Sequence, residues 1–98
     1  MATPDLIQSW ARTEALLNEA RTELPTDVAA EFSSQLEQFA EFLAHNELGL
    51  AFDTMLGIVE DAGCAAAPLI QALVLAAGNM GREQLRQSLA EQLASLTS

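Results

Sequence analysis

The sequence contains no lysine and no tyrosine, and it has only one cysteine and one histidine. A lone cysteine excludes an intramolecular disulfide and fits a reducing compartment. Cys64 is followed by three alanines, with no basic neighbour in sequence to activate its thiol, and no glycine-rich loop precedes a lysine to bind phosphate. We therefore expect no enzyme and no bound cofactor.

Metal-ligating residues are equally scarce. Glu41 and His45 are four residues apart, so they share one helix face and could touch a metal ion or share a proton. A single pair is far from a complete zinc or di-iron site. We favour a structural role for His45 at a helix end and expect no metal.

Long apolar runs and strand-like alternation are also missing. The longest apolar stretch, residues 62–78, is interrupted by Pro68 and Gln71 and is shorter than the roughly 20 residues that span a bilayer. The N-terminal residues lack the basic region and apolar run of a secretory signal. We expect a cytoplasmic protein that does not bind membranes.

Charge is the most informative property of the composition. The net charge is −10, and the sixty residues between Arg21 and Arg82 hold nine acids and no base. Such a field repels nucleic acid and anionic membranes and attracts cationic partners. The alternative interpretation is that the acids only maintain solubility.

Helical periodicity runs through the whole chain, and it predicts an all-α fold: one domain, residues 1–98, forming a compact bundle of about five helices. Capping residues, prolines and glycines set the expected bounds. These are Thr3-Pro4 to about Glu23, Thr26 or Asp27 to about His45, Glu47 to about Ala62 with Asn46 as N-cap, Pro68 to about Ala77, and residues 82–96.

The expected third helix has apolar residues around more than half of its circumference, so it should pack on two sides and lie centrally. Glu60 and Asp61 fall in its last turn, where the helix dipole disfavours acids. A broken local rule of this kind marks a candidate functional position. The alternative is that both side chains are well solvated and cost little.

Trp10 is the only tryptophan, and it lies on the first helix. Its spacing favours burial in the core. Tryptophan is also enriched at interface hot spots, so an exposed anchor is the second interpretation.

The stretch FLAHNELGLA at residues 42–51, the acidic pair Glu60-Asp61 and the stretch PLIQALVLAAGNMG at residues 68–81 together form a recognisable pattern. It resembles small all-helical immunity proteins of bacterial toxin systems, of the Maf and contact-dependent-inhibition types. The resemblance covers about residues 28–81 and leaves out the first and last helices. It implies a protein that binds and neutralises a cognate toxin, often a nuclease, in the cytoplasm.

The charge argument is compatible with this resemblance, because a nuclease cleft must be basic and an inhibitor can present carboxylates to it. The expected partner is therefore a basic toxin domain. The acids expected to contact it are Glu37, Glu41, Glu47, Asp53, Glu60 and Asp61. Glu47 could instead serve the start of its own helix. The alternative function is a self-associating helical adaptor or chaperone subunit, which allows a homodimer.

Overall fold

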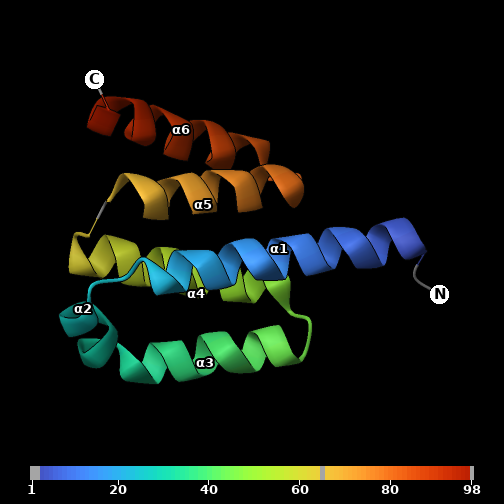
Figure 1. Ribbon diagram of the computed structural model, residues 1–98, viewed down its shortest axis with the longest axis horizontal. Coiled ribbons are helices and arrows are strands. Elements are labelled where there is room, and N and C mark those ends of the chain that lie inside the picture. Colours follow the sequence, from blue (N-terminus) through green and yellow to red (C-terminus); the bar gives the residue numbers. More distant parts are fainter. Residues whose placement is uncertain (1–2, 65, 98) are drawn as a thin grey trace.

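The computed structural model describes residues 3–64 and 66–97, and all regular structure in these ranges is α-helical (Figure 1). The elements are α1 (Pro4–Thr22), α2 (Thr26–Glu31), α3 (Ser33–Ala44), α4 (Leu48–Ala62), α5 (Ala67–Asn79) and α6 (Glu83–Thr97). The predicted all-α bundle is confirmed. No helix in the described ranges is long and apolar enough to cross a membrane.

Helix α1 begins and ends where the sequence predicts. The Leu6 amide donates a 3.2 Å hydrogen bond to the Thr3 hydroxyl oxygen, and Pro4 occupies the first helical position. Proline suits this position because its missing N–H group would have no partner there. Pro25 then excludes helix at the residue before it, so the chain turns before α2.

The single helix expected between Thr26 and His45 is wrong, because the chain breaks at Phe32 into α2 and α3. Phe32 has φ −102° and ψ 30°, outside the helical region, and its half-buried side chain packs against the core. Two serines follow it, and serine competes with helix formation through its hydroxyl group. The bundle therefore has six helices in the described ranges, with short α2 crossing one end (Figure 1).

Three helices end in the same local structure, a left-handed residue followed by a 6→1 backbone hydrogen bond. The left-handed residues are Asn46 (φ 56°), Gly63 (φ 66°) and Gly81 (φ 77°). After Asn46, for example, the Glu47 amide donates to the Phe42 carbonyl at 2.8 Å. This is the Schellman pattern, which satisfies the last carbonyls of a helix. Asn46 therefore closes α3 and does not cap α4, contrary to prediction.

The core is one continuous cluster, to which α1 to α6 all contribute. Helix α4 packs against α3 on one side and α1 on another, and α5 lies between α1 and α6. The central position predicted for the α4 segment is confirmed. The fully buried side chains include Leu17, Phe39, Phe52, Met55 and Leu73. The molecule is flat, with extents of 40 × 31 × 18 Å.

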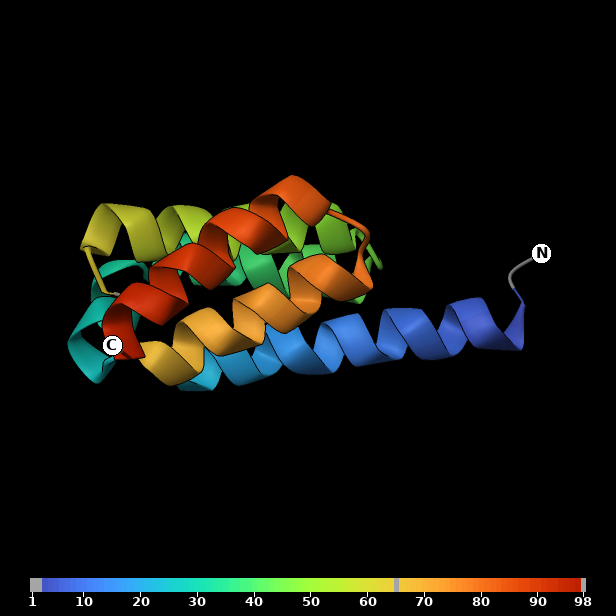
Figure 2. The same cartoon turned by 90° about the horizontal axis from the view of Figure 1, so that it is seen from above.

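The long helices alternate in direction along this flat bundle, which we call the slab. Some helix termini therefore lie at one end of the slab and the others at the opposite end (Figures 1 and 2). One end holds α2 and the C-terminal ends of α1, α4 and α6. The other end holds the α3–α4 and α5–α6 turns, and the first turns of α1 project beyond it (Figure 2). We call the first the α2 end and the second the α1 end.

A partly buried polar contact holds α1 to α5 near the α1 end. The Asn79 side-chain amide donates to the Ser9 carbonyl at 2.8 Å and to the Thr13 hydroxyl at 2.7 Å. Thr13 is only 2% exposed, so its hydroxyl needs a partner inside the protein. The pair of contacts fixes the position of α1 along α5.

Candidate partner-binding surface

The structure separates the six predicted contact acids into groups that do not share one surface. Glu37 and Glu41 are exposed on α3. The buried residues of that helix are Leu36 and Phe39, and helical geometry places both acids on the opposite side. They form an outward pair near the middle of α3, away from the acids of α4.

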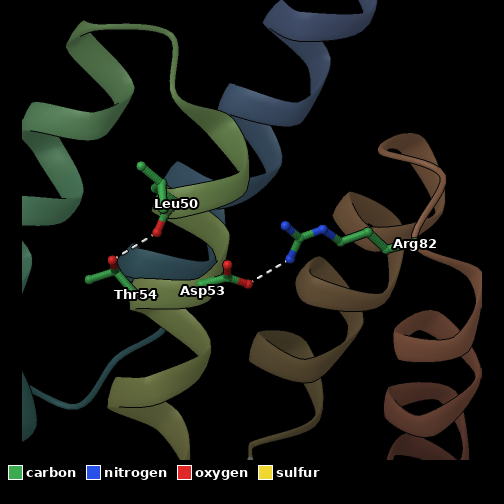
Figure 3. Close-up of polar contacts among 4 residues, drawn as sticks. All are labelled: Leu50, Asp53, Thr54 and Arg82. Carbon is green, nitrogen blue, oxygen red and sulfur yellow. Dashed lines mark hydrogen bonds and ion pairs between the residues drawn. The ribbon is translucent and has the colours of Figure 1, made fainter.

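Asp53 has a partner inside the molecule (Figure 3). The Arg82 guanidinium donates a 2.6 Å hydrogen bond to its carboxylate and lies 5.6 Å from the centre of the Phe52 ring. The guanidinium lies close to Gly49, where an added Cβ would be 3.0 Å from it, so a larger residue there would require the Arg82 side chain to shift. Asp53 thus helps to join the start of α6 to α4.

Glu47 lies directly before α4 at the α1 end and makes no capping hydrogen bond with its side chain. Glu60 lies thirteen residues further along, so the two acids are about 20 Å apart along the helix axis. Glu60 and Asp61 are both exposed in the last turn of α4, at the α2 end. They are the only members of the predicted set at that end.

Three acids that the prediction omitted lie at the α2 end together with Glu60 and Asp61. Glu23 follows α1, and Asp27 and Glu31 lie on α2. All three are exposed. An alternating helix topology brings the end of the first helix, α2 and the end of α4 to the same end of the slab (Figure 1). Tracing the direction of successive helices in the sequence could have found this grouping.

We name this group the acidic end; its residues are Glu23, Asp27, Glu31, Glu60 and Asp61. None of these five carboxylates forms an ion pair with another described residue. Arg21, in the last turn of α1, is the one basic side chain nearby in sequence, and it is exposed. The N-termini of α3 and α5 lie at the same end as the C-termini of α1, α4 and α6, so the helix dipoles partly cancel there (Figure 1).

A shallow groove runs beside the acidic end, between the C-terminal part of α1, α2 and α3. Small and apolar side chains form most of it, with one charge of each sign. Its lining residues are Arg21, Ala29, Ala30, Ser33, Leu36, Glu37 and Ala40. Of the two α3 acids, Glu37 lines this groove and Glu41 does not. Glu37 therefore lies at the edge of an apolar surface that continues towards α2.

Glu41, His45 and Cys64 were the residues considered above for catalysis or metal binding, and the structure shows the contacts and burial of each. His45 donates from Nδ1 to the Glu41 backbone carbonyl at 2.9 Å, a carbonyl that also accepts from the His45 amide, and the Glu41 carboxylate takes no part in the contact. In the described part of the chain, no three His, Cys, Asp or Glu side chains are placed to hold a metal ion. Cys64 is half-buried after the end of α4.

Trp10 is half-buried at the edge of the α1 end. Neither interpretation from the sequence, burial in the core or an exposed anchor, describes Trp10 fully, because its side chain is only partly buried at the surface. It lines a recess with Leu6, Leu48 and Met80.

Comparison of the chain with protein-family models, with curated proteins and with solved structures gives no significant match. The fold and surface therefore define only a class: a small all-helical protein with five exposed carboxylates at one end that form no ion pair with another described residue.

Proposed function

We propose that this protein is an immunity protein, which binds a basic toxin domain in the cytoplasm and neutralises it through the acidic end. The observation that carries the proposal is the group of five exposed carboxylates without ion-pair partners at that end. Like charges held together on a folded surface destabilise it by mutual repulsion. A cationic partner would remove that cost and gain the attraction.

The position of Glu60 and Asp61 supports the same proposal. They occupy the last turn of α4, which contains no basic residue, so each carboxylate faces the negative end of its own helix. The fold gains nothing from this placement. A bound arginine or lysine side chain would gain from both the carboxylates and the helix end.

A nuclease domain is the toxin that fits this surface best, because its cleft must attract phosphate groups. Carboxylates at the acidic end would occupy the cleft or its rim in place of phosphates. Charge complementarity of this kind raises the association rate and selects against neutral partners. The neighbouring groove supplies the apolar contact that long-range attraction alone does not provide.

The proposal is tested by a pull-down of the tagged protein from its native host, with mass spectrometry of the retained proteins at low and high salt. A basic toxin-like protein, retained at about 50 mM salt and weakened at about 500 mM, is the expected result, since salt screens charge attraction. Retention of no basic protein at low salt would contradict it.

Two matched variants locate the site in the same experiment. Glu60→Gln with Asp61→Asn removes two charges from the acidic end, and Glu37→Gln with Glu41→Gln removes two from α3. We expect the first to reduce retention strongly. The second should act weakly, through Glu37 alone. Equal retention by both variants and the unmodified protein would exclude the acidic end as the site.

The alternative, a self-associating helical adaptor or chaperone subunit, also has an observation in its favour. Leu6 and Ile7 are 43% and 52% exposed on the first turns of α1. An adaptor would retain only copies of itself, without dependence on salt, and would tolerate neutralisation of Glu60 and Asp61.

A further inference from the structure

Gly57 differs from the other four glycines, because no contact in the described structure calls for a glycine there. Gly63 and Gly81 have left-handed backbone angles. At Gly49 and Gly78 an added Cβ would lie 3.0 and 3.2 Å from an arginine side chain. At Gly57 it would meet no described atom within 4 Å, although glycine is among the least favourable residues inside a helix. The fold would accept alanine, so the glycine indicates a requirement outside the single chain.

Gly57 lies in the middle of the side of α4 that faces away from α1 (Figure 3). Leu50, Thr54, Gly57 and Asp61 are spaced four, three and four residues apart, so they lie within about 60° of one another around the helix. Leu50 is 50% exposed, and its carbonyl accepts a 2.8 Å hydrogen bond from the Thr54 hydroxyl (Figure 3). Glu60 borders this row beside Asp61. We call these five residues the outer face of α4.

The uncompensated charge of the outer face lies at its C-terminal end. Asp53 borders the face nearer its start, but its carboxylate is paired with Arg82, so these two charges offset each other. Glu60 and Asp61 are exposed and form no ion pair with another described residue, and the last turn of α4 contains no basic residue. The outer face is therefore uncharged up to Gly57 and negative beyond it.

We propose that the outer face of α4 receives a helix of the basic partner, which crosses α4 at Gly57. The face from Leu50 to Asp61 is about 16 Å long, which corresponds to three turns of helix. A row of residues with this spacing is the surface against which a second helix packs, and a glycine at the crossing lets the two backbones approach closely. The charge pattern selects the occupant's composition: apolar residues against Leu50, and arginine or lysine against Glu60 and Asp61.

The same charge pattern disfavours a second copy of this chain as the occupant. The chain has a net charge of −10, and the one basic side chain beside the outer face, Arg82, is already paired with Asp53. Two outer faces packed together would bury the carboxylates of Glu60 and Asp61 without a cation to receive them. The inference rests on the proposed function, and it adds which face of α4 the basic partner contacts and with what kind of segment.

The test is a titration of the basic protein retained in the pull-down, after its purification, with variants of this chain. Gly57→Leu places a large side chain at the proposed crossing, and we expect it to raise the Kd at least about tenfold. Ala15→Leu is the matched control, because Ala15 is exposed on α1, which lies on the other side of α4 (Figure 3). It should bind like the unmodified protein. Circular dichroism and urea unfolding check that both variants fold.

Gly57→Ala separates the contact from the stability of the chain. It should raise the urea midpoint, because alanine favours a helix, and it should weaken binding by less than leucine does. A substitution that stabilises the free protein and weakens its complex is expected where a residue serves binding at the cost of stability. No fault in folding can explain weaker binding by a more stable variant.

Leu50→Gln tests the apolar end of the outer face, and Leu75→Gln is its control, because Leu75 is 44% exposed on α5. We expect only the first to weaken binding. If the unmodified protein retains no basic protein, the proposed function fails, and this inference fails with it. If Glu60→Gln with Asp61→Asn weakens binding while Gly57→Leu and Leu50→Gln leave the Kd unchanged, the proposed function stands and this inference alone is overturned.

Discussion

Two glycines, one within α4 and one directly after it, provide a matched test of the backbone geometry, since the same substitution should change stability in opposite directions. Gly63 has φ 66°, the left-handed conformation that ends the helix. Gly57 lies within α4, and a Cβ there would meet nothing within 4 Å. We therefore expect Gly63→Ala to destabilise the protein and Gly57→Ala to stabilise it.

The magnitudes follow from the two conformations. A left-handed alanine costs about 1–2 kcal/mol, of which restriction of the unfolded chain returns about 0.4–1 kcal/mol, so Gly63→Ala should lose about 1 kcal/mol. Alanine exceeds glycine in helix propensity by about 0.8–1.0 kcal/mol, so Gly57→Ala should gain about that much. The variants should thus differ by about 2 kcal/mol, or roughly 8–16 °C in Tm for a domain of this size.

Urea unfolding followed by far-ultraviolet circular dichroism measures both free energies of unfolding under identical conditions. The unmodified protein should lie between the two variants. If both substitutions changed stability in the same direction by similar amounts, the assignment of Gly63 to the helix end and of Gly57 to an open helix face would be refuted.

Four further substitutions test polar contacts between and within the helices. Asn79→Ala removes the partly buried hydrogen bonds to α1, and urea unfolding should show a loss of about 1–3 kcal/mol. Arg82→Met removes an exposed ion pair and a cation–π contact, and should cost about 1 kcal/mol, whereas Asp53→Asn should cost less in the same assay. The hydrogen bond from Arg86 lowers the pKa of the Glu83 carboxyl below its usual value of 4.5 in the folded protein. The stability that this bond contributes is therefore present above pH 4.5, and it is lost as the pH falls through the folded-state pKa. Glu83→Gln should therefore lower the urea midpoint at pH 7 and leave it nearly unchanged near pH 2.

The sequence predicted those features of the fold that depend on local chemistry. Proline at position 4 and the proline break at position 25 set the ends of α1, and Gly63 ends α4 as expected. The break at Phe32 was missed, because the apolar spacing of Val28, Phe32 and Leu36 continues one helical face across it. The tertiary packing of a short α2 across the bundle end outweighs that local pattern.

Asn46 shows a second limit of local rules. Asparagine is favoured both as an N-cap and in the left-handed residue that closes a helix. Between α3 and α4 the two positions fall side by side, so sequence could not choose between them. The hydrogen bond from the Glu47 amide to the Phe42 carbonyl selects the helix-closing role.

The candidate site was predictable only in part. Glu60 and Asp61 were identified by their unfavourable position in a helix, which is a local property. Their grouping with Asp27 and Glu31 depends on the direction of each helix in the bundle, which becomes clear only when the successive helices are traced as alternating in direction. Asp53 was assigned to a partner in the prediction, but its partner in the structure is Arg82, twenty-nine residues away.

The measurement that tests the central claim most directly is the association rate between this protein and the basic protein that the pull-down retains. It should be measured by stopped-flow over a range of salt concentrations. Glu60→Lys with Asp61→Lys is the test variant, and Glu37→Lys with Glu41→Lys is the control with the same change in net charge. We predict that reversal at the acidic end lowers the rate much more than reversal on α3 and flattens its salt dependence. Equal rates for the two variants would show that net charge, and not the acidic end, drives association.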